Sequence, residues 1–514
     1  MSPSTNRPLA LIILDGWGFS NREEGNAIAL AHTPFYDQIR RDFPMTTLVA
    51  AGSRVGQAPE ASGSPEIGHM NIGTGRTARS ESVRILESIR NGEFAKNEVL
   101  LRAIGRLASN GRSLHLIGML SDGGVHSSTE SLFALLRMAK NCGVTRVFVH
   151  CILDGVDVPP RTADIYVEAL EIKLADIGVG QIATLCGRHL AMDSRGNWER
   201  TARAFTMMVH GEGERSNDAV NSIRNSFLRG IADEFISPIV LESAPDVPLT
   251  RIENGDAVVF FNHRAEGIRQ LVRSLSVADT SGSAKPVIDT VCLVEYDKDF
   301  DLPVAFEPEP ATHVLTDVLA EAGIASVRIT QSERFPHVTH FFNGGAIAHQ
   351  QNEHHILLPT PRDESVEQRP ESQSFKIVDK FIQSLDAVQN GVFVVNLPAA
   401  DLVAETGRLD KTIEAVQYVD TCLGGIVEHV QAASGVAIVT SSHGNCEEMT
   451  NLTTGEPHYL TTANQVPFHI ISGYQTSPRL RTDGTLADVA PTILSILGVE
   501  RPESMTGRDL LVQE

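Results

Sequence analysis

The sequence predicts an α/β fold built on mostly parallel sheets with helices on both faces. Apolar runs of strand length alternate along the chain with longer stretches whose apolar residues recur at helical spacing. The apolar runs are rich in Val, Ile, Leu and Phe with little polar alternation, which is typical of strands buried on both faces of a parallel sheet. Several runs lead into Asp, His or Arg, and ligands bind at the carboxyl ends of strands in such sheets.

The first expected strand lies in residues 8–15 (PLALIILD) and delivers Asp15 at its carboxyl end. The same pattern predicts strands at the start of 113–126, 146–155, 257–264, 391–398 and 435–445. Helical periodicity predicts helices within 128–143 and 162–178. Two apolar-poor stretches, 277–286 and 361–374, are expected to be exposed connections, and the first is also a candidate domain boundary.

The length and charge of the chain limit its organisation and its partners. A chain of 514 residues is too long for one hydrophobic core, so at least two domains are expected. A formal net charge of −21 argues against nucleic acid and against an anionic membrane surface as partners. An anionic substrate therefore requires a local cluster of arginines.

The cysteines and the apolar segments indicate a cytoplasmic protein. The six cysteines form no CxxC pair and no dense framework, which is typical of reduced thiols. The N-terminal apolar run ends at Asp15 without a small-residue cleavage site, so we do not interpret it as a secretory signal. No stretch has the roughly 18 apolar residues that a membrane span needs.

Residues 63–76 (GSPEIGHMNIGTGR) combine four glycines with Ser64, Pro65 and several polar side chains. Glycines at this density allow a backbone to approach a ligand closely, which raises the possibility that Ser64 is a nucleophile. The alternative is a surface turn made of Gly, Ser and Pro.

The expected strand ends carry a set of side chains suited to binding charged ligands. Asp, Glu and His are ligands for divalent cations, and arginines bind phosphate or carboxylate groups with two hydrogen bonds. Each residue alone also has a structural interpretation, as a cap or as an ion-pair partner. The set comprises Asp15, His126, Asp154, Asp157, Arg188, Asp193, Arg264, Asp401, Glu405 and His443.

A series of motifs resembles, in order, the cofactor-independent phosphoglycerate mutases of the alkaline phosphatase superfamily. The motifs are LIILDGWG, GHMNIGTGR, LIGMLSDGGVHS, LDGVDVPPRTA, IATLCGR, FFNHR, ERFPHVTHFFNGG, TSSHGN and LADVAPTILSILGVERPESMTGRDL, and they span Pro8 to Leu511. The resemblance implies a phosphatase-like, metal-binding domain made of residues 1–77 and 310–514. An α/β phosphotransferase domain that binds substrate would be inserted between them at 78–309.

In the family, a serine takes the phosphoryl group from one hydroxyl of phosphoglycerate and returns it to the other, assisted by two manganese ions. The family motif Gly-Asn-Ser-Glu-Val-Gly-His aligns with GSPEIGH here, so Pro65 stands at the nucleophile position and Ser64 at the asparagine position. Proline cannot accept a phosphoryl group. Ser64 becomes the nucleophile only after a local shift of register, and the following proline restricts Ser64 to extended conformations.

The metal positions that the resemblance implies are also altered. Glu405 and Thr461 stand where the family has histidines, and Ser442 stands where it has an aspartate. Pro65 also removes the serine ligand. The remaining set supports at most one Mn²⁺ or Mg²⁺, with no 2,3-bisphosphoglycerate as cofactor, and consists of Asp15, Asp401, Glu405 and His443.

The resemblance also implies a substrate site with fewer cations than in the family. Residues at matching positions are His126, Asp157, Arg188, Arg264 and Glu333, with Arg334 in place of a lysine. Three family arginines are replaced by Val156, Ser194 and Gly267. The arginines nearest to them in sequence are Arg161, Arg195 and Arg269, although a shift of one residue along a strand reverses the face of a side chain.

Two functional hypotheses follow. The first is an enzyme that acts on a small phosphorylated or phosphonate-bearing carboxylate, by the mutase reaction through Ser64 or by a remodelled reaction. The second is a non-catalytic relative that binds an anionic metabolite without turnover. Both have a small anionic metabolite as partner, and the resemblance implies a monomer.

Overall fold

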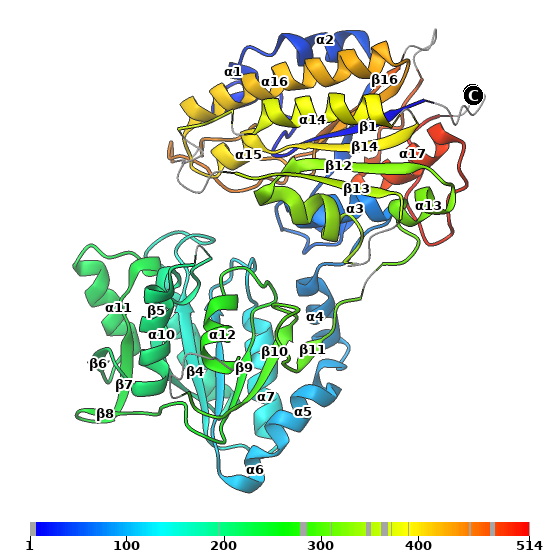
Figure 1. Ribbon diagram of the computed structural model, residues 1–514. Helices are drawn as coiled ribbons and strands as arrows, with labels where there is room; N and C mark the ends of the chain where they lie inside the picture. Colours follow the sequence, from blue (N-terminus) through cyan, green and yellow to red (C-terminus); the bar gives the residue numbers. More distant parts are fainter. Residues whose placement is uncertain are drawn as a thin grey trace. The chain divides into compact units, whose positions relative to one another are not determined.

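The computed structural model describes residues 7–512 except 195, 278–284, 310, 346–350, 361–367, 372, 389, 452–453 and 473–477. The chain forms two compact units (Figure 1). Unit 1 comprises Met1–Ser80 and Glu309–Glu514, and unit 2 comprises Glu81–Pro308. Both are layered α/β structures, which confirms the predicted fold class. In the described part of the chain, no helix is long and apolar enough to cross a bilayer.

Unit 1 is organised around one mixed sheet whose central strands are parallel. Strand β1 (Leu9–Leu14) lies between β14 (Gly391–Leu397) and β15 (Val436–Thr440) and is parallel to both. The outer strands in sheet order are β13 (Glu353–Leu358) and β12 (Ala325–Gln331) beyond β14, and β16 (Val466–Ser472), β2 (Met45–Val49) and β17 (Gly484–Thr485) beyond β15.

Alternate residues of β1 enter two separate cores on the two faces of this sheet. Ala10, Ile12 and Leu14 belong to one buried cluster, and Leu9, Leu11 and Ile13 belong to the other. Helices α14 and α16 lie on the first side, and α13, α17 and α3 lie on the second (Figure 1). The helices of unit 1 are α1 (Ala27–Leu30), α2 (Pro34–Asp42), α3 (Pro65–Thr74), α13 (Leu315–Glu321), α14 (Ser374–Ala387), α15 (Ala399–Ala404), α16 (Leu409–Ala432) and α17 (Val489–Leu497).

The glycine-rich stretch 63–76 is mostly helix α3, so its interpretation as a surface turn is wrong. Proline at the first helical position has a suitable φ and lacks an N–H that the helix would leave unpaired. Ser64 precedes it with φ −138° and ψ 133°, the extended conformation expected before proline. The glycines serve close helix packing, because a Cβ on Gly68 would lie 2.1 Å from the backbone oxygen of Ser442.

Unit 2 has its own mostly parallel sheet and its own core. Its central strands are β9 (Ala257–Phe260), β3 (Leu114–Leu120), β4 (Val147–Leu153) and β5 (Gln181–Gly187), which are parallel neighbours in that order. The outer strands are β10 (Asp289–Val294) and β11 (Val304–Phe306) on one side, and β7 (Ile239–Ala244), β6 (Glu214–Ser216) and β8 (Val247–Pro248) on the other.

The helices of unit 2 include the two that the sequence predicted. Residues 128–143 contain α7 (Thr129–Asn141), and residues 162–178 contain α8 (Ala163–Ile177). The others are α4 (Glu81–Arg90), α5 (Glu98–Gly105), α6 (Leu107–Asn110), α9 (Arg188–Ala191), α10 (Trp198–His210), α11 (Ala219–Leu228) and α12 (Arg269–Ser276).

The two expected connections have different outcomes. The candidate boundary at 277–286 lies inside unit 2, and its residues 278–284 lie outside the described residues. The chain passes between the units at Ser80–Glu81 and Pro308–Glu309 instead. The stretch 361–374 falls largely outside the described residues.

Candidate functional site

Three neighbouring strands of unit 1 end at the same edge of the sheet and bring predicted site residues together. Asp15 follows β1, Asp401 lies in α15 shortly after β14, and His443 follows β15. Because β14, β1 and β15 are parallel and adjacent, their carboxyl ends meet. His443 Nε2 lies 3.1 Å from Asp401 Oδ1, which confirms that residues from different strand ends converge.

The guanidinium of Arg334 lies among these carboxylates. Arg334 ends the short 3₁₀ helix Ser332–Arg334, which directly follows β12. Its Nη2 donates to Asp401 Oδ2 at 2.6 Å and to Glu405 Oε1 at 2.8 Å. Its Nε lies 3.6 Å from Asp15 Oδ2. Arg334 therefore binds three of the four residues that the sequence predicted as metal ligands.

Other protein donors bind the remaining oxygens of the two buried aspartates. Asp401 Oδ1 accepts from Asn445 Nδ2 at 3.1 Å in addition to its contact with His443. Asp15 accepts from Asn396 Nδ2 at 2.8 Å and from the Ser442 hydroxyl. Each oxygen of both carboxylates thus has a donor within the protein.

The electrostatics of this cluster favour a charged Asp401 beside a charged Arg334 guanidinium. Burial opposes the charged form of Arg334, but Asp401, Glu405 and Asp15 outweigh it and raise the pKa of Arg334. Burial likewise opposes ionisation of Asp401, yet His443 and Arg334 lower its pKa. Partial desolvation raises the pKa of Glu405 despite the nearby Arg334 guanidinium.

The donor set does not fit a metal ion in its present arrangement. Among the residues that the structure describes, no group of three or more His, Cys, Asp or Glu side chains is placed to hold one. Asp15, Asp401, Glu405 and His443 do lie near one another, but Arg334 lies between the carboxylates. Binding of a single ion by these four residues stays a prediction and requires Arg334 to move.

The hydroxyl of Ser64 has a structural role at the start of α3. Its Oγ accepts from the Ile67 N–H at 3.4 Å and donates to Glu66 Oε2 at 2.6 Å. It is therefore the N-cap of the helix, a position where a Ser side chain typically contributes about 1 kcal/mol. Pro65, next to it, contributes no hydroxyl. In the loop that carries Thr461, the hydroxyl of the neighbouring Thr462 donates to Glu447.

Sequence reasoning missed several polar residues that build this edge of the sheet. Glu447 Oε2 accepts from the N–H groups of Gly18 at 3.0 Å and Asn445 at 2.8 Å, and it thereby fixes the loops after β1 and β15 to each other. His69 Nδ1 lies 2.8 Å from the Pro65 oxygen, and its Nε2 lies 3.7 Å from Asp15 Oδ1. The signal available in the sequence was the run of polar residues in SSHGNCEE after an apolar strand.

A second cluster lies at the carboxyl ends of β3, β4 and β5 in unit 2. Arg188 Nη1 donates to Asp154 Oδ1 and to Asp157 Oδ2, both at 2.7 Å. Its Nη2 lies 2.9 Å from His126 Nε2. The strands that precede these residues are adjacent and parallel, which places the four side chains together. Arg264 follows β9 at the same edge, and its Nη2 lies 2.8 Å from Glu266 Oε2.

Burial sets the charge balance in this second cluster. Burial opposes the charged form of Arg188, but Asp157 and Asp154 raise its pKa. Burial also raises the pKa of Asp157, against the effect of Arg188. A partly buried arginine between two acids and a histidine can exchange part of its hydrogen bonding for an incoming anion.

The structure describes two of the three arginines considered as substitutes, Arg269 and Arg161. Arg269 Nε donates to the Tyr296 oxygen at 2.8 Å, on the side of β10. The backbone N–H of Arg161 donates to Asp233, and its φ is +65°. Arg195 lies outside the described residues. In unit 1, Glu333 Oε2 accepts from Thr360 Oγ1 at 2.7 Å and from Gln331 Nε2 at 2.9 Å.

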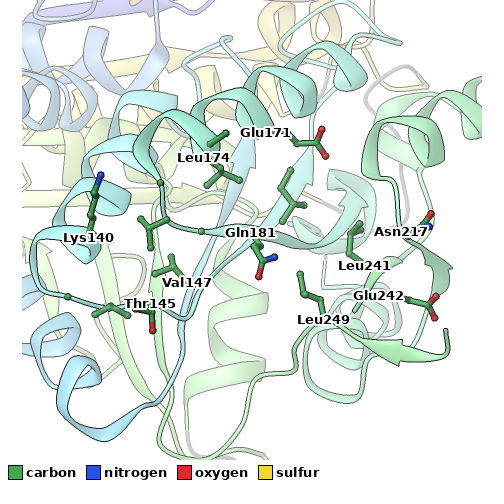
Figure 2. Close-up of a pocket in the computed structure, with 17 residues that line it drawn as sticks. Lys140, Thr145, Val147, Glu171, Leu174, Gln181, Asn217, Leu241, Glu242 and Leu249 are labelled. Atoms are coloured by element: carbon green, nitrogen blue, oxygen red, sulfur yellow. The ribbon is translucent and has the colours of Figure 1, made fainter. Parts of the chain in front are cut away.

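The open pocket drawn in Figure 2 lies elsewhere in unit 2. It has a volume of about 750 Å³ and is lined by the first residues of β4 and β5 together with Lys140 and Glu171. The predicted substrate residues follow the opposite ends of these strands. This pocket is therefore separate from the cluster around Arg188.

Comparisons with known proteins assign the chain to a family. Residues 85–298 match the family described as the BPG-independent PGAM N-terminus. A 2,3-bisphosphoglycerate-independent phosphoglycerate mutase of Desulforudis audaxviator is 42% identical, with 99% of this chain and 100% of that protein covered. The corresponding protein of Moorella thermoacetica is 41% identical over 100% of both chains.

A solved structure leads to the same assignment. The phosphoglycerate mutase of Leishmania mexicana, crystallised at low cobalt concentration, matches with a TM-score of 0.85 and 29% identity. The match covers 99% of this chain and 98% of that one. Together with the strand-end clusters in both units, these matches show that the chain belongs to the 2,3-bisphosphoglycerate-independent phosphoglycerate mutase family.

Proposed function

We propose that this protein binds a small phosphorylated carboxylate of the phosphoglycerate type and does not isomerise it through a phosphoserine. The observation that carries the proposal is the state of the nucleophile position. The resemblance to the family motif puts Pro65 at that position, and the neighbouring Ser64 hydroxyl caps α3 and donates to Glu66. The relatives are named phosphoglycerate mutases, which supports phosphoglycerate as the ligand class.

The cluster in unit 2 supports retention of anion binding. Arg188 presents a planar fork of donors, and His126 and Asp157 lie beside it to accept or donate hydrogen bonds to a hydroxyl of the ligand. Arg264 adds a second cation whose side chain is 34% exposed and therefore accessible to a ligand. Because both arginines also contact carboxylates, an anion has to compete for them, and we expect modest affinity.

A remodelled phosphoryl transfer through Ser64 is the second candidate. The 2.6 Å hydrogen bond from Ser64 to Glu66 favours it, because that carboxylate is positioned to take the hydroxyl proton. The Oγ–P bond would form as the phosphate ester bond of the substrate breaks, and the departing oxygen would take a proton. This candidate requires Ser64 to leave its capping position.

Calorimetric titration of the full-length protein with 3-phosphoglycerate tests binding. We expect saturable binding that weakens at least tenfold in Arg264→Gln, since loss of a charge-assisted pair costs about 1.5–3 kcal/mol. Arg224→Gln is the matched control, because Arg224 is an exposed arginine of unit 2 that pairs with Asp164. Absence of binding by the unmodified protein contradicts the proposal.

Turnover is measured separately by ³¹P NMR of 2- and 3-phosphoglycerate, with and without added MnCl₂. We expect no interconversion, while an active relative interconverts them under the same conditions. Interconversion together with a mass increase of one phosphoryl group on Ser64 would replace the proposal by the second candidate.

A further inference from the structure

The carboxylate cluster of unit 1 contains a cation that belongs to the chain itself. We propose that the Arg334 guanidinium is the resident cation of this cluster, and that Asp15, Asp401 and Glu405 bind a divalent metal ion only when Arg334 is removed. This inference is independent of the proposed anion binding, which concerns residues of unit 2.

The position of Arg334 Nη2 supports this role. One nitrogen contacts oxygens of two carboxylates at 2.6 and 2.8 Å, and therefore occupies the space that a shared metal ion would need. The Arg334 side chain is 9% exposed, and those of Asp15 and Asp401 are 0% and 1% exposed. Solvent ions consequently have little access to the aspartates while the guanidinium is present.

Secondary structure places Asp401, Glu405 and Arg334 next to one another. Asp401 and Glu405 are four residues apart on α15 and its C-cap, so their side chains lie on one face of that turn. Arg334 follows β12, which pairs directly with β14, the strand that leads into α15. The guanidinium and the carboxylates thus come from adjacent strand ends, and their contact needs no rearrangement.

Charge explains why the cluster needs a cation. Three carboxylates come within 4 Å of the guanidinium, and two of them are buried. Removing a buried charged partner leaves the others uncompensated, which is strongly destabilising. A divalent ion can replace the lost positive charge while binding several carboxylate oxygens at once.

Metal content tests the proposal directly. The unmodified protein and Arg334→Ala are treated with EDTA, dialysed against MnCl₂ and then buffer, and analysed for metal per chain by mass spectrometry. We expect substoichiometric Mn²⁺ in the unmodified protein and about one ion per chain in Arg334→Ala. We also expect MnCl₂ to raise the melting temperature of Arg334→Ala and to leave that of the unmodified protein unchanged.

Two further variants serve as controls for metal binding. Arg334→Gln removes the charge, keeps much of the side-chain volume, and is expected to gain Mn²⁺ as Arg334→Ala does. Arg334→Ala combined with Asp401→Asn removes one ligand and is expected to lose at least tenfold in Mn²⁺ affinity relative to Arg334→Ala. If Arg334→Ala fails to fold without metal, folding in the presence of MnCl₂ supports the proposal, and failure in both conditions contradicts it.

Stoichiometric Mn²⁺ in the unmodified protein would overturn the proposal, because the cluster would then accept metal with Arg334 in place. A folded Arg334→Ala that gains no Mn²⁺ would overturn it as well. Neither result bears on 3-phosphoglycerate binding, which is tested with Arg264→Gln. Either proposal can therefore fail without the other.

Discussion

Gly68 illustrates how a residue type acquires its meaning from its neighbours. In the sequence it belongs to a glycine-rich stretch that suggests a flexible turn. In the structure it lies inside α3, against the backbone oxygen of Ser442 in the loop after β15. The helix can approach that loop only because residue 68 lacks a side chain.

We predict that Gly68→Ala lowers the free energy of unfolding by roughly 1–3 kcal/mol, since the new Cβ would lie 2.1 Å from a backbone atom. Gly105→Ala is the matched control, because nothing lies within 4 Å of a Cβ there and Ala favours the helix by up to about 1 kcal/mol. Urea denaturation of both variants measures the difference. Equal stabilities would show that the loop after β15 yields to the added methyl group.

Arg334 shows what tertiary contacts add to a position in a family pattern. The sequence grouped it with the substrate-binding residues, which stays a prediction, and the structure adds that it lies between Asp401, Glu405 and Asp15. The replacement of ligands elsewhere in the pattern was visible in the sequence. The contacts of Arg334 that compensate the charge of the carboxylates join residues from separate strand ends, so no local sequence pattern indicates them.

At the scale of elements, strand β16 carries an unusual buried group. His469 is fully buried between β15 and β2, packs edge-on against Tyr36 at 5.6 Å, and has no hydrogen-bond partner at either ring nitrogen among the described residues. Burial, with a smaller effect of Arg40, lowers its pKa to about 4. The histidine is therefore neutral in the folded protein at pH values where the unfolded chain is protonated.

This shift predicts an acid sensitivity with a definite sign. Between pH 6.5 and about 4 the unfolded state binds the proton and the folded state does not, so stability falls as the pH falls. Over this pH interval, the free energy of unfolding of His469→Leu should fall by roughly 3 kcal/mol less than that of the unmodified protein. Free energies of unfolding at several pH values measure it, and parallel curves for the two proteins would contradict the assignment.

At the scale of the whole molecule, each unit has hydrophobic core clusters of its own. All buried residues of one large cluster lie in unit 2, whereas the two clusters on either side of the first sheet lie in unit 1. The ends of unit 2 are also close to each other, because Arg84 Nη2 donates to the Glu307 oxygen at 2.7 Å. An insertion with adjacent ends and its own core is expected to fold alone.

We therefore predict that residues 81–308, expressed separately, unfold in one cooperative transition. Circular dichroism during thermal unfolding measures it, and amide exchange shows whether β3, β4 and β5 are protected. A fragment without a cooperative transition would show that unit 2 depends on the rest of the chain. The same fragment tests whether the cluster around Arg188 binds 3-phosphoglycerate without unit 1.

The sequence by itself determined the α/β class, the parallel strands and the residues at their ends. It could do so because strand burial on two faces requires continuous apolar runs, and because parallel neighbours bring their carboxyl ends to one edge. Only the tertiary structure decided that Ser64 caps a helix, that Gly68 serves packing and that Arg334 occupies the carboxylate cluster. These outcomes depend on contacts between segments far apart in the chain, where distance and burial, rather than local residue pattern, determine which group binds which.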